Sequence, residues 1–181
     1  MSILQLHQLS KSYGRIKAVQ DLSLTVNRGN IYGILGPNGS GKTTTLGIVL
    51  GILKNDSGNY EWFDGQYGNK ALLKIGALLE TPNFYPYLDA QRNLDIVAHI
   101  KKVKQPRIDE LLKLVNLAHR RKSVFRSFSF GMKQRLAIAA AMIGDPEVLI
   151  FDEPTNGLDP QGIAEVRETI LRIAQMGKTI I

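Results

Sequence analysis

Cysteine is absent from this chain of 181 residues, so no disulfide bond can contribute to its stability. Long apolar runs are absent too, which excludes a membrane-spanning helix within the printed sequence. Residues 1–5 lack a basic segment followed by an apolar one, and we therefore expect no signal peptide. A cytosolic protein is the default expectation from these absences.

The composition that remains is typical of a globular protein. Hydrophobic residues make up 44% and charged residues 22%, which suits one domain with room for a small subdomain. The net charge of +7 suits nucleic acid, anionic lipid head groups or a polyanionic ligand, and the charge alone does not distinguish them. We interpret the basic clusters at 101–104 and 120–126 as solvated surface, with a nucleic-acid or lipid footprint as the alternative.

A glycine-rich stretch at 36–43 follows an apolar run at 31–35 and precedes a helical pattern. Glycines allow several backbone N–H groups to converge on one concavity, and the following helix adds unpaired amides and the positive end of its dipole. Lys42 supplies a cation for the β- and γ-phosphates, and Thr43 supplies a hydroxyl for Mg²⁺. The stretch therefore predicts a nucleotide-binding P-loop, and a simple glycine-rich turn is the alternative.

The hydrophobic patterns alternate between strand and helix periods along the chain. Strands are predicted at residues 3–9, 21–26, 31–35, 60–63, 75–79 and 148–151. Helices are predicted at 44–53, from residue 89 onward, at 108–115, after Ser129 and after Asp159, and turns at 10–15, 27–30 and 55–59. Consecutive helices between the last two strands indicate a helical insert instead of a βαβ unit.

Acidic residues follow two of the apolar runs. Asp152 and Glu153 end the run at 148–151, where two adjacent acids are costly without a cation. In a P-loop protein the first fixes Mg²⁺ and the second polarises the attacking water, whereas a purely structural acid pair is the alternative. Glu80 ends the run at 75–79, at the edge where open α/β sheets bind their ligands.

Two further residues are candidates for contacts with a nucleotide. Ser129 is a plausible N-cap of an alanine-rich helix, and a helix N-terminus beside Gly131 can hold an anion, although a plain capped helix is the alternative. Tyr13 lies in the polar turn at 10–15, where an exposed ring can stack on a base or serve ordinary packing.

These motifs, in this order, resemble the ATP-binding subunit of an ABC transporter over nearly the whole sequence. In that family residues 36–43 correspond to Walker A, 148–153 to Walker B with its catalytic glutamate, and 156–159 to the D-loop. Ser129 falls in the signature segment (128–132), where Phe-Ser-Phe-Gly-Met replaces the usual Leu-Ser-Gly-Gly-Gln. The variant signature, together with Glu80 in place of the usual Q-loop glutamine, resembles the bacitracin and lantibiotic exporters.

The resemblance implies a set of functional residues and two cofactors, ATP and Mg²⁺. The implied catalytic residues are Glu153, Lys42 and Glu80, and the implied metal-binding residues are Thr43, Glu80 and Asp152. Nucleotide binding falls to Tyr13, Gly36, Pro37, Asn38, Gly39, Ser40, Gly41, Lys42, Thr43, Thr44, Ser129 and Gly131.

The fold class that the resemblance implies is α/β. A RecA-like P-loop parallel sheet flanked by helices is expected at 31–82 and 145–181, an antiparallel β part at 1–30 and 59–64, and a helical subdomain at 83–144, all within one ABC-type ATPase domain. The implied partners are a second ATP-binding subunit, identical or closely related, and a separate transmembrane permease. The location is then the inner face of the cell membrane, and no nucleic acid is expected.

The family's switch histidine has no counterpart, since His7, His99 and His119 lie elsewhere. We therefore expect the sequence to stop within the domain and to hydrolyse ATP weakly or not at all. Three functions stay open: a transport ATPase of peptide-antibiotic or drug exporter type, a soluble ABC-type ATPase acting on nucleic acid or ribosomes, and a nucleotide-binding fragment without turnover.

Overall fold

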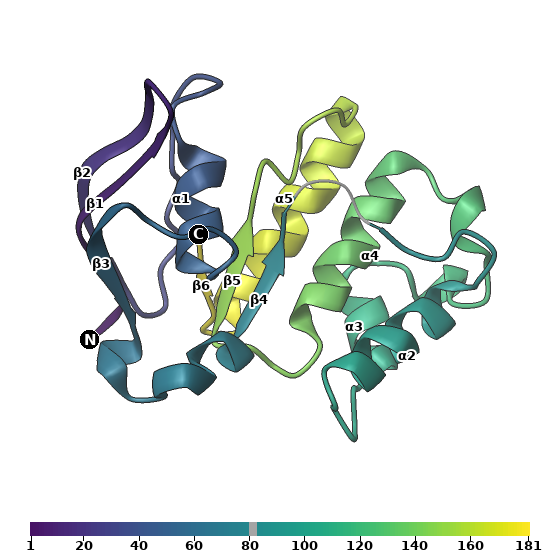
Figure 1. Ribbon diagram of the computed structural model, residues 1–181. Coiled ribbons are helices and arrows are strands. Elements are labelled where there is room, and N and C mark those ends of the chain that lie inside the picture. Colours follow the sequence, from purple (N-terminus) through teal and green to yellow (C-terminus); the bar gives the residue numbers. More distant parts are fainter. Residues whose placement is uncertain (80–82) are drawn as a thin grey trace.

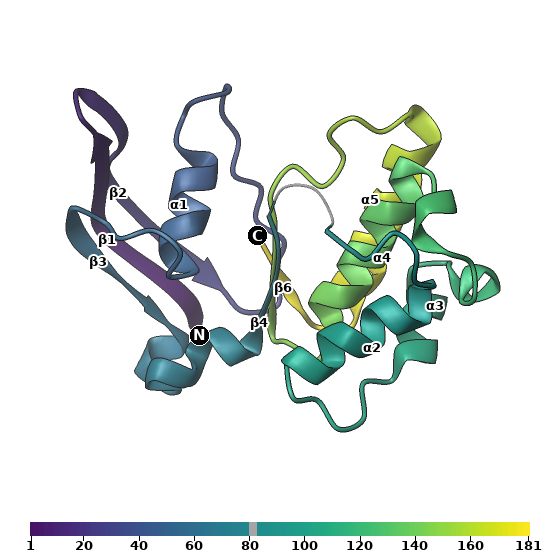
Figure 2. The ribbon, with the colours of Figure 1, turned by 45° about the vertical axis from the view of Figure 1, so that its right-hand side comes forward.

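The structure is a computed structural model that describes residues 1–79 and 83–181. Glu80, predicted as a metal and catalytic residue, lies outside the described residues. Two sheets stand on either side of helix α1 (Lys42–Val49), and the longer helices of residues 90–175 pack on the far side of the second sheet (Figure 1). Figure 2 shows the same layers after rotation, with α1 between the sheets.

The first sheet is antiparallel, with strand order β2-β1-β3. Its strands are β1 (Ser2–Tyr13), β2 (Ile16–Asn27) and β3 (Ser57–Trp62). The predicted polar turn at 10–15 is wrong, because residues 10–13 continue β1 and the hairpin turns at Gly14, where φ is +60°. Register shifts along β1 accommodate this polar end of the ladder.

The second sheet is parallel and has strand order β4-β5-β6. Its strands are β4 (Ile75–Leu78), β5 (Val148–Phe151) and β6 (Thr179–Ile180). The predicted strand at 31–35 does not form: a single parallel bridge joins Ile31 to Ile180, since β6 offers only two residues for pairing. The amide of Tyr32 still donates to Ile180 O at 2.8 Å, so the run before the P-loop lies beside β6.

Three of the longer helices begin at capping side chains, and the sequence predicted two of these caps, Ser129 and Asp159. The longer helices are α2 (Ala90–Ile100), α3 (Ile108–Leu114), α4 (Phe130–Met142) and α5 (Pro160–Gln175), and short 3₁₀ turns lie at Phe63–Gly65, Gly68–Lys74, Ala118–Arg120 and Phe125–Ser127. The side chains of Asp89, Ser129 and Asp159 each accept a hydrogen bond from the amide three residues on. Helix α1 ends at Val49, earlier than the predicted 53, because Gly51 takes a left-handed φ of +71°.

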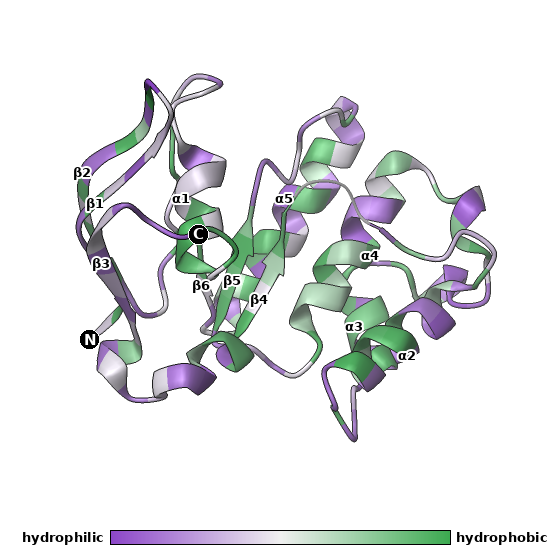
Figure 3. Cartoon of the chain, viewed as in Figure 1, coloured by the Kyte–Doolittle hydropathy of each residue, from purple (hydrophilic) through white to green (hydrophobic). Residues whose placement is uncertain are grey.

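Strand β5 lies between two apolar cores. Leu149 and Phe151 face a core built with α2 to α5, while Val148 and Ile150 face a second core with α1 and the antiparallel sheet. Both faces are covered, which explains why this strand is entirely apolar, as its green colour in Figure 3 shows. The polar residues that follow β5 therefore emerge from a rigid, buried element.

Candidate nucleotide site

The P-loop (36–43) lies against β2, and this contact explains its last glycine. Gly41 precedes α1 with φ +86°, and a Cβ there would lie 2.1 Å from the carbonyl oxygen of Ala18. Gly39 has φ +82°. No other residue type suits position 41, because a side chain there would clash with β2 and would have to adopt a left-handed backbone conformation.

Lys42 occupies the first turn of α1 with its ammonium folded back over the loop. Its Nζ donates to the carbonyl oxygens of Gly36 at 2.9 Å and Pro37 at 3.1 Å. The same atom lies 3.7 Å from Oε1 of Glu153. A polyphosphate bound along the loop would meet this cation directly.

Thr43 and Asp152 meet although they lie 109 positions apart in the sequence. The Thr43 hydroxyl donates to Oδ2 of Asp152 at 2.7 Å. The amide of Asp152 donates to Leu78 O at 2.9 Å, which continues the β4–β5 ladder and fixes the carboxylate at the edge of the sheet. One hydroxyl and one carboxylate side by side suit Mg²⁺, which prefers oxygen ligands and keeps several waters.

Among residues 1–79 and 83–181, few side chains are placed to serve together as metal ligands. The described residues contain no group of three or more His, Cys, Asp or Glu side chains that could form a complete metal cage. This fits a cation held mainly by nucleotide phosphates and water, with Thr43 and Asp152 as its protein partners.

Glu153 completes a hollow of about 330 Å³ over the P-loop. Its backbone has φ +46°, and its Oε2 accepts a hydrogen bond from Nδ2 of Asn156 at 3.2 Å. The hollow is lined by Ala18, Asn38, Gly39, Gly41, Lys42, Thr43, Thr44 and Glu153. Sequence reasoning missed Ala18. Its contact with the P-loop is made by its backbone carbonyl, so the residue type gives no signal of it.

The signature residues lie elsewhere. Ser129 and Gly131 are at the start of α4, on the side of the parallel sheet away from α1 (Figures 1 and 2). They line a separate hollow of about 500 Å³ together with D-loop residues, and no P-loop residue lines it. Within one chain, then, the signature segment and the P-loop do not form one site.

Tyr13 lies at the hairpin tip between β1 and β2 and is 48% exposed. The ammonium of Lys11 lies 5.7 Å from its ring centroid. Tyr13 does not line the hollow over the P-loop, and its stacking on a base stays a prediction.

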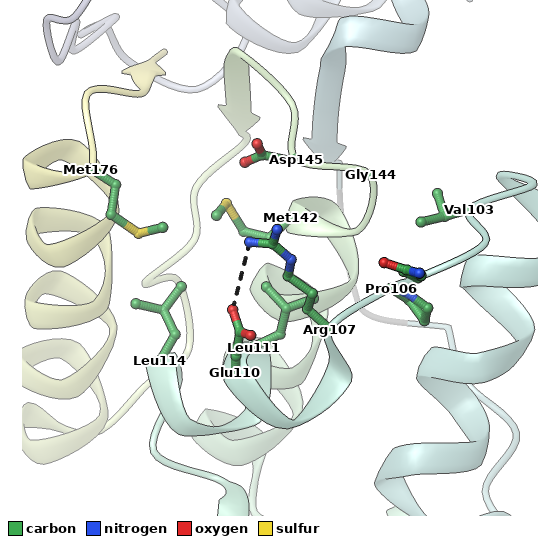
Figure 4. A pocket seen from close by; sticks show the side chains of 11 residues that line it. Val103, Pro106, Arg107, Glu110, Leu111, Leu114, Met142, Gly144, Asp145 and Met176 are labelled. Carbon is green, nitrogen blue, oxygen red and sulfur yellow. Dashed lines mark ion pairs between the residues drawn. The ribbon is translucent and has the colours of Figure 1, made fainter.

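A larger cavity of about 520 Å³ lies at the opposite end of β5 (Figure 4). Its lining includes Met142 and Met176, and Arg107 and Glu110, three residues apart at the start of α3, form an ion pair at 3.9 Å on its wall. Asp145 on its rim precedes β5, whereas ligands of open α/β sheets bind beyond the carboxyl ends of the strands. Volume therefore does not identify the reactive site in this molecule.

Most basic residues of the clusters at 101–104 and 120–126 are exposed, and some of them also make contacts within the chain. Lys101 donates to the carbonyl oxygens of Ala140, Ala141 and Ile143 at 3.1 to 3.3 Å and so caps the end of α4. Burial lowers the pKa of the Lys101 ammonium. Arg121 pairs with Asp109 at 2.7 Å. The exposure of Lys102, Lys104 and Arg126 agrees with the interpretation of the clusters as solvated surface.

Comparison with known proteins identifies the family of this chain. The family model for the ABC transporter matches residues 19–156, which is more than half of the chain. The chain belongs to the ABC transporter family. It is 47% identical over 96% of its length to the bacitracin transport ATP-binding protein BcrA of Bacillus licheniformis, and 38% identical over 99% to the lantibiotic transport ATP-binding protein SrtF of Streptococcus pyogenes.

Solved structures agree on the fold of this ABC chain. The protein cbiO1 of Clostridium perfringens, part of the ABC transporter complex cbiONQ, superposes with a TM-score of 0.86 at 30% identity, over 99% of this chain and 77% of that one. An ATP-binding cassette in its ADP conformation gives 0.87 at 25% identity, over 99% and 80%. The expected RecA-like α/β fold is confirmed.

The relatives are longer than this chain. The ABC chain spans 58% of the length of the bacitracin relative and 78% of the lantibiotic one. No helix among the described residues is both long enough and apolar enough to cross a membrane.

Proposed function

We propose that this ABC chain binds ATP with Mg²⁺ and hydrolyses it to power transport through a separate permease. The observation that carries the proposal is the convergence of four side chains on the P-loop: Lys42 faces Glu153 at 3.7 Å, and Thr43 touches Asp152 at 2.7 Å. A cation for phosphate, oxygen ligands for a metal and a carboxylate base are the parts that phosphoryl transfer to water requires.

In this proposal the P-loop amides and Lys42 hold the phosphates, Thr43 and Asp152 hold Mg²⁺, and Tyr13 stacks on the base. Mg²⁺ offsets the charge of the phosphates when it is bound. Glu153 accepts a proton from the attacking water, and its bond from Asn156 orients the carboxylate. Glu80 keeps the metal and catalytic role that the family resemblance assigns.

Two copies are needed for the complete site. Ser129 and Gly131 do not line the hollow over their own P-loop, so they act on a nucleotide only when a second ATP-binding subunit presents them. Closure of two such subunits on ATP then drives the permease, at the inner face of the membrane. The names of the relatives support an exporter of peptide-antibiotic type.

The test compares ATP hydrolysis by the full-length protein with that of two variants. Lys42→Ala should lose ATP binding, and Glu153→Gln should keep ATP binding but lose hydrolysis by at least about a hundredfold, since an amide cannot act as a base. Lys54→Ala, an exposed lysine near the end of the α1 region, is the control and should behave as wild type. Normal ATP affinity and rate in both site variants would contradict the proposed site.

A further inference from the structure

Arg135 is a buried cation that nothing in the proposed chemistry uses. Its side chain is only 8% exposed, and it lies on α4, six residues after Ser129. Its Nη1 donates to the carbonyl oxygens of Val115 at 3.0 Å and Asn116 at 3.3 Å. Its Nη2 lies 2.9 Å from Oε2 of Glu165. One guanidinium therefore holds three elements together: the end of α3, the helix α4 and the helix α5.

Two of the elements joined by Arg135 adjoin motifs of the proposed site. Helix α4 begins at the signature segment, and α5 begins where the D-loop ends. A second polar link runs beside the first, because Nε2 of Gln134 donates to the carbonyl oxygen of Pro154, the residue after Glu153, at 3.2 Å. Neighbouring residues of α4 thus contact Pro154 at the start of the loop at 153–159 and Glu165 on α5, the helix that follows the loop.

The signature segment and the D-loop also touch directly. A Cβ on Gly157 would lie 3.4 Å from the ring of Phe130, and one on Gly131 would lie 3.6 Å from Cα of Gly162. Arg135 and Glu165 line the same hollow as these residues. The ion pair between Arg135 and Glu165 therefore lies beside the place where the two segments approach each other.

We propose that Arg135 is a positioning residue that, through Glu165, holds the signature segment and the loop at 153–159 as one unit. The inference rests on the proposed function. When the signature of one copy engages ATP on the other, the unit moves together and brings Glu153 of the first copy into line with its own nucleotide. The two ATP sites of a dimer are thereby coupled through each chain.

Orientation accounts for this arrangement better than stability does. Buried ion pairs are often no more stabilising than apolar residues of similar volume, but a guanidinium bound on several edges fixes direction. Nε of Arg135 and Oε1 of Gln134 are buried and find no hydrogen-bond partner among residues 1–79 and 83–181. A set of bonds left incomplete in this way does not maximise the stability of the fold.

The experiment measures ATP-dependent dimerisation of the full-length protein in a Glu153→Gln background, together with ATP affinity at low protein concentration. Arg135→Met should raise the ATP concentration needed for half-maximal dimerisation by about tenfold, within the range typical of coupled sites, without changing ATP affinity of the monomer. Arg135→Lys keeps the positive charge but loses the planar guanidinium with its several donors. Its ATP concentration for half-maximal dimerisation should lie between those of the wild type and Arg135→Met. Arg172→Met is the matched control, since it removes an exposed arginine that pairs with Glu168 on α5.

Glu165→Gln tests the inference independently if Arg135→Met does not fold, because it keeps the shape of the side chain and removes only its charge; it should shift dimerisation in the same direction. Unchanged dimerisation in Glu165→Gln, or in a folded Arg135→Met, would overturn the inference. A loss of monomer ATP affinity as large as the change in dimerisation would also overturn the inference, since it would indicate that the substitution damages the nucleotide site itself. Failure of Glu153→Gln alone to bind ATP or dimerise contradicts the proposed function instead, and the inference falls with it.

Discussion

At the scale of single residues, the site depends on contacts that cross the chain. Thr43 and Asp152 come from different elements, and their 2.7 Å contact places a hydroxyl and a carboxylate where one cation can bind both. Glu153 faces Lys42 from the opposite side of the same hollow. Each of these side chains can be changed with little loss of volume.

Thr43→Val removes the hydroxyl and keeps the shape. We expect ATP binding measured with Mg²⁺ to weaken by about tenfold, the effect of about 1.4 kcal/mol, while binding without Mg²⁺ changes little. Thr25→Val, on the exposed face of β2, is the control for the same chemical change. Equal weakening with and without Mg²⁺ would remove Thr43 from the metal site.

Gly41→Ala tests the approach of the P-loop to β2. A Cβ 2.1 Å from the Ala18 oxygen, at φ +86°, must displace the loop, so nucleotide binding should be lost while the cores stay folded. Gly33→Ala is a suitable control because its Cβ would meet nothing within 4 Å and its φ is not left-handed. Isothermal titration with ATP distinguishes the two variants, and wild-type affinity in Gly41→Ala would contradict the geometry.

At the scale of elements, the parallel sheet is held at its amino end by Glu147, the residue before β5. Its carboxylate accepts bonds from Arg28 at 2.5 Å and from the Tyr67 hydroxyl at 2.9 Å. Burial raises the pKa of the Glu147 carboxyl, but these two hydrogen bonds and the charge of Arg28 outweigh it, so the pKa lies below its usual value. Three separate segments thus meet at one acid.

The sign of this shift predicts a pH dependence. A carboxyl with a lowered pKa in the folded state stabilises the fold above its unfolded pKa, near 4.5, and loses that contribution as the pH falls further. Glu147→Gln should therefore reduce stability at pH 7 and flatten its decline between about pH 5 and pH 3. Urea unfolding at several pH values measures this, with Glu61→Gln on β3 as an exposed control; an unchanged acid slope would contradict it.

Elements with strong local patterns were predictable from the sequence. The run at 148–151 is β5 to the residue, because an all-apolar strand can only be buried on both faces. The caps at Ser129 and Asp159 were also predicted correctly. The strand expected at 31–35 was wrong, since its pairing depends on β6, a partner distant in the sequence and two residues long.

The site was predictable where chemistry fixes residue type and less so where the backbone does. Lys42, Thr43, Asp152 and Glu153, which were singled out by their residue types in the P-loop and after the apolar run at 148–151, lie together in the structure. The contact of Ala18 with the P-loop and the bonds made by Arg135 are tertiary contacts, and no local sequence pattern predicts them.

At the scale of the whole molecule, the two halves of the proposed site lie on different faces of the parallel sheet. The P-loop side carries the phosphate and metal ligands, and the α4 side carries the signature segment. A single copy cannot bring them together without breaking β5 out of its two cores. We therefore expect two copies of the chain to close head to tail on ATP.

This closure can be measured by cysteine cross-linking, because the printed sequence contains no cysteine of its own. Asn38 lines the P-loop hollow and Phe130 lines the signature hollow, so a Glu153→Gln protein that carries both Asn38→Cys and Phe130→Cys reports their approach through a short thiol cross-linker. We predict a covalent dimer that forms with ATP and not without it, whereas each single-cysteine protein stays monomeric. Absence of the cross-linked dimer with ATP bound, or its equal formation without ATP, would contradict the account.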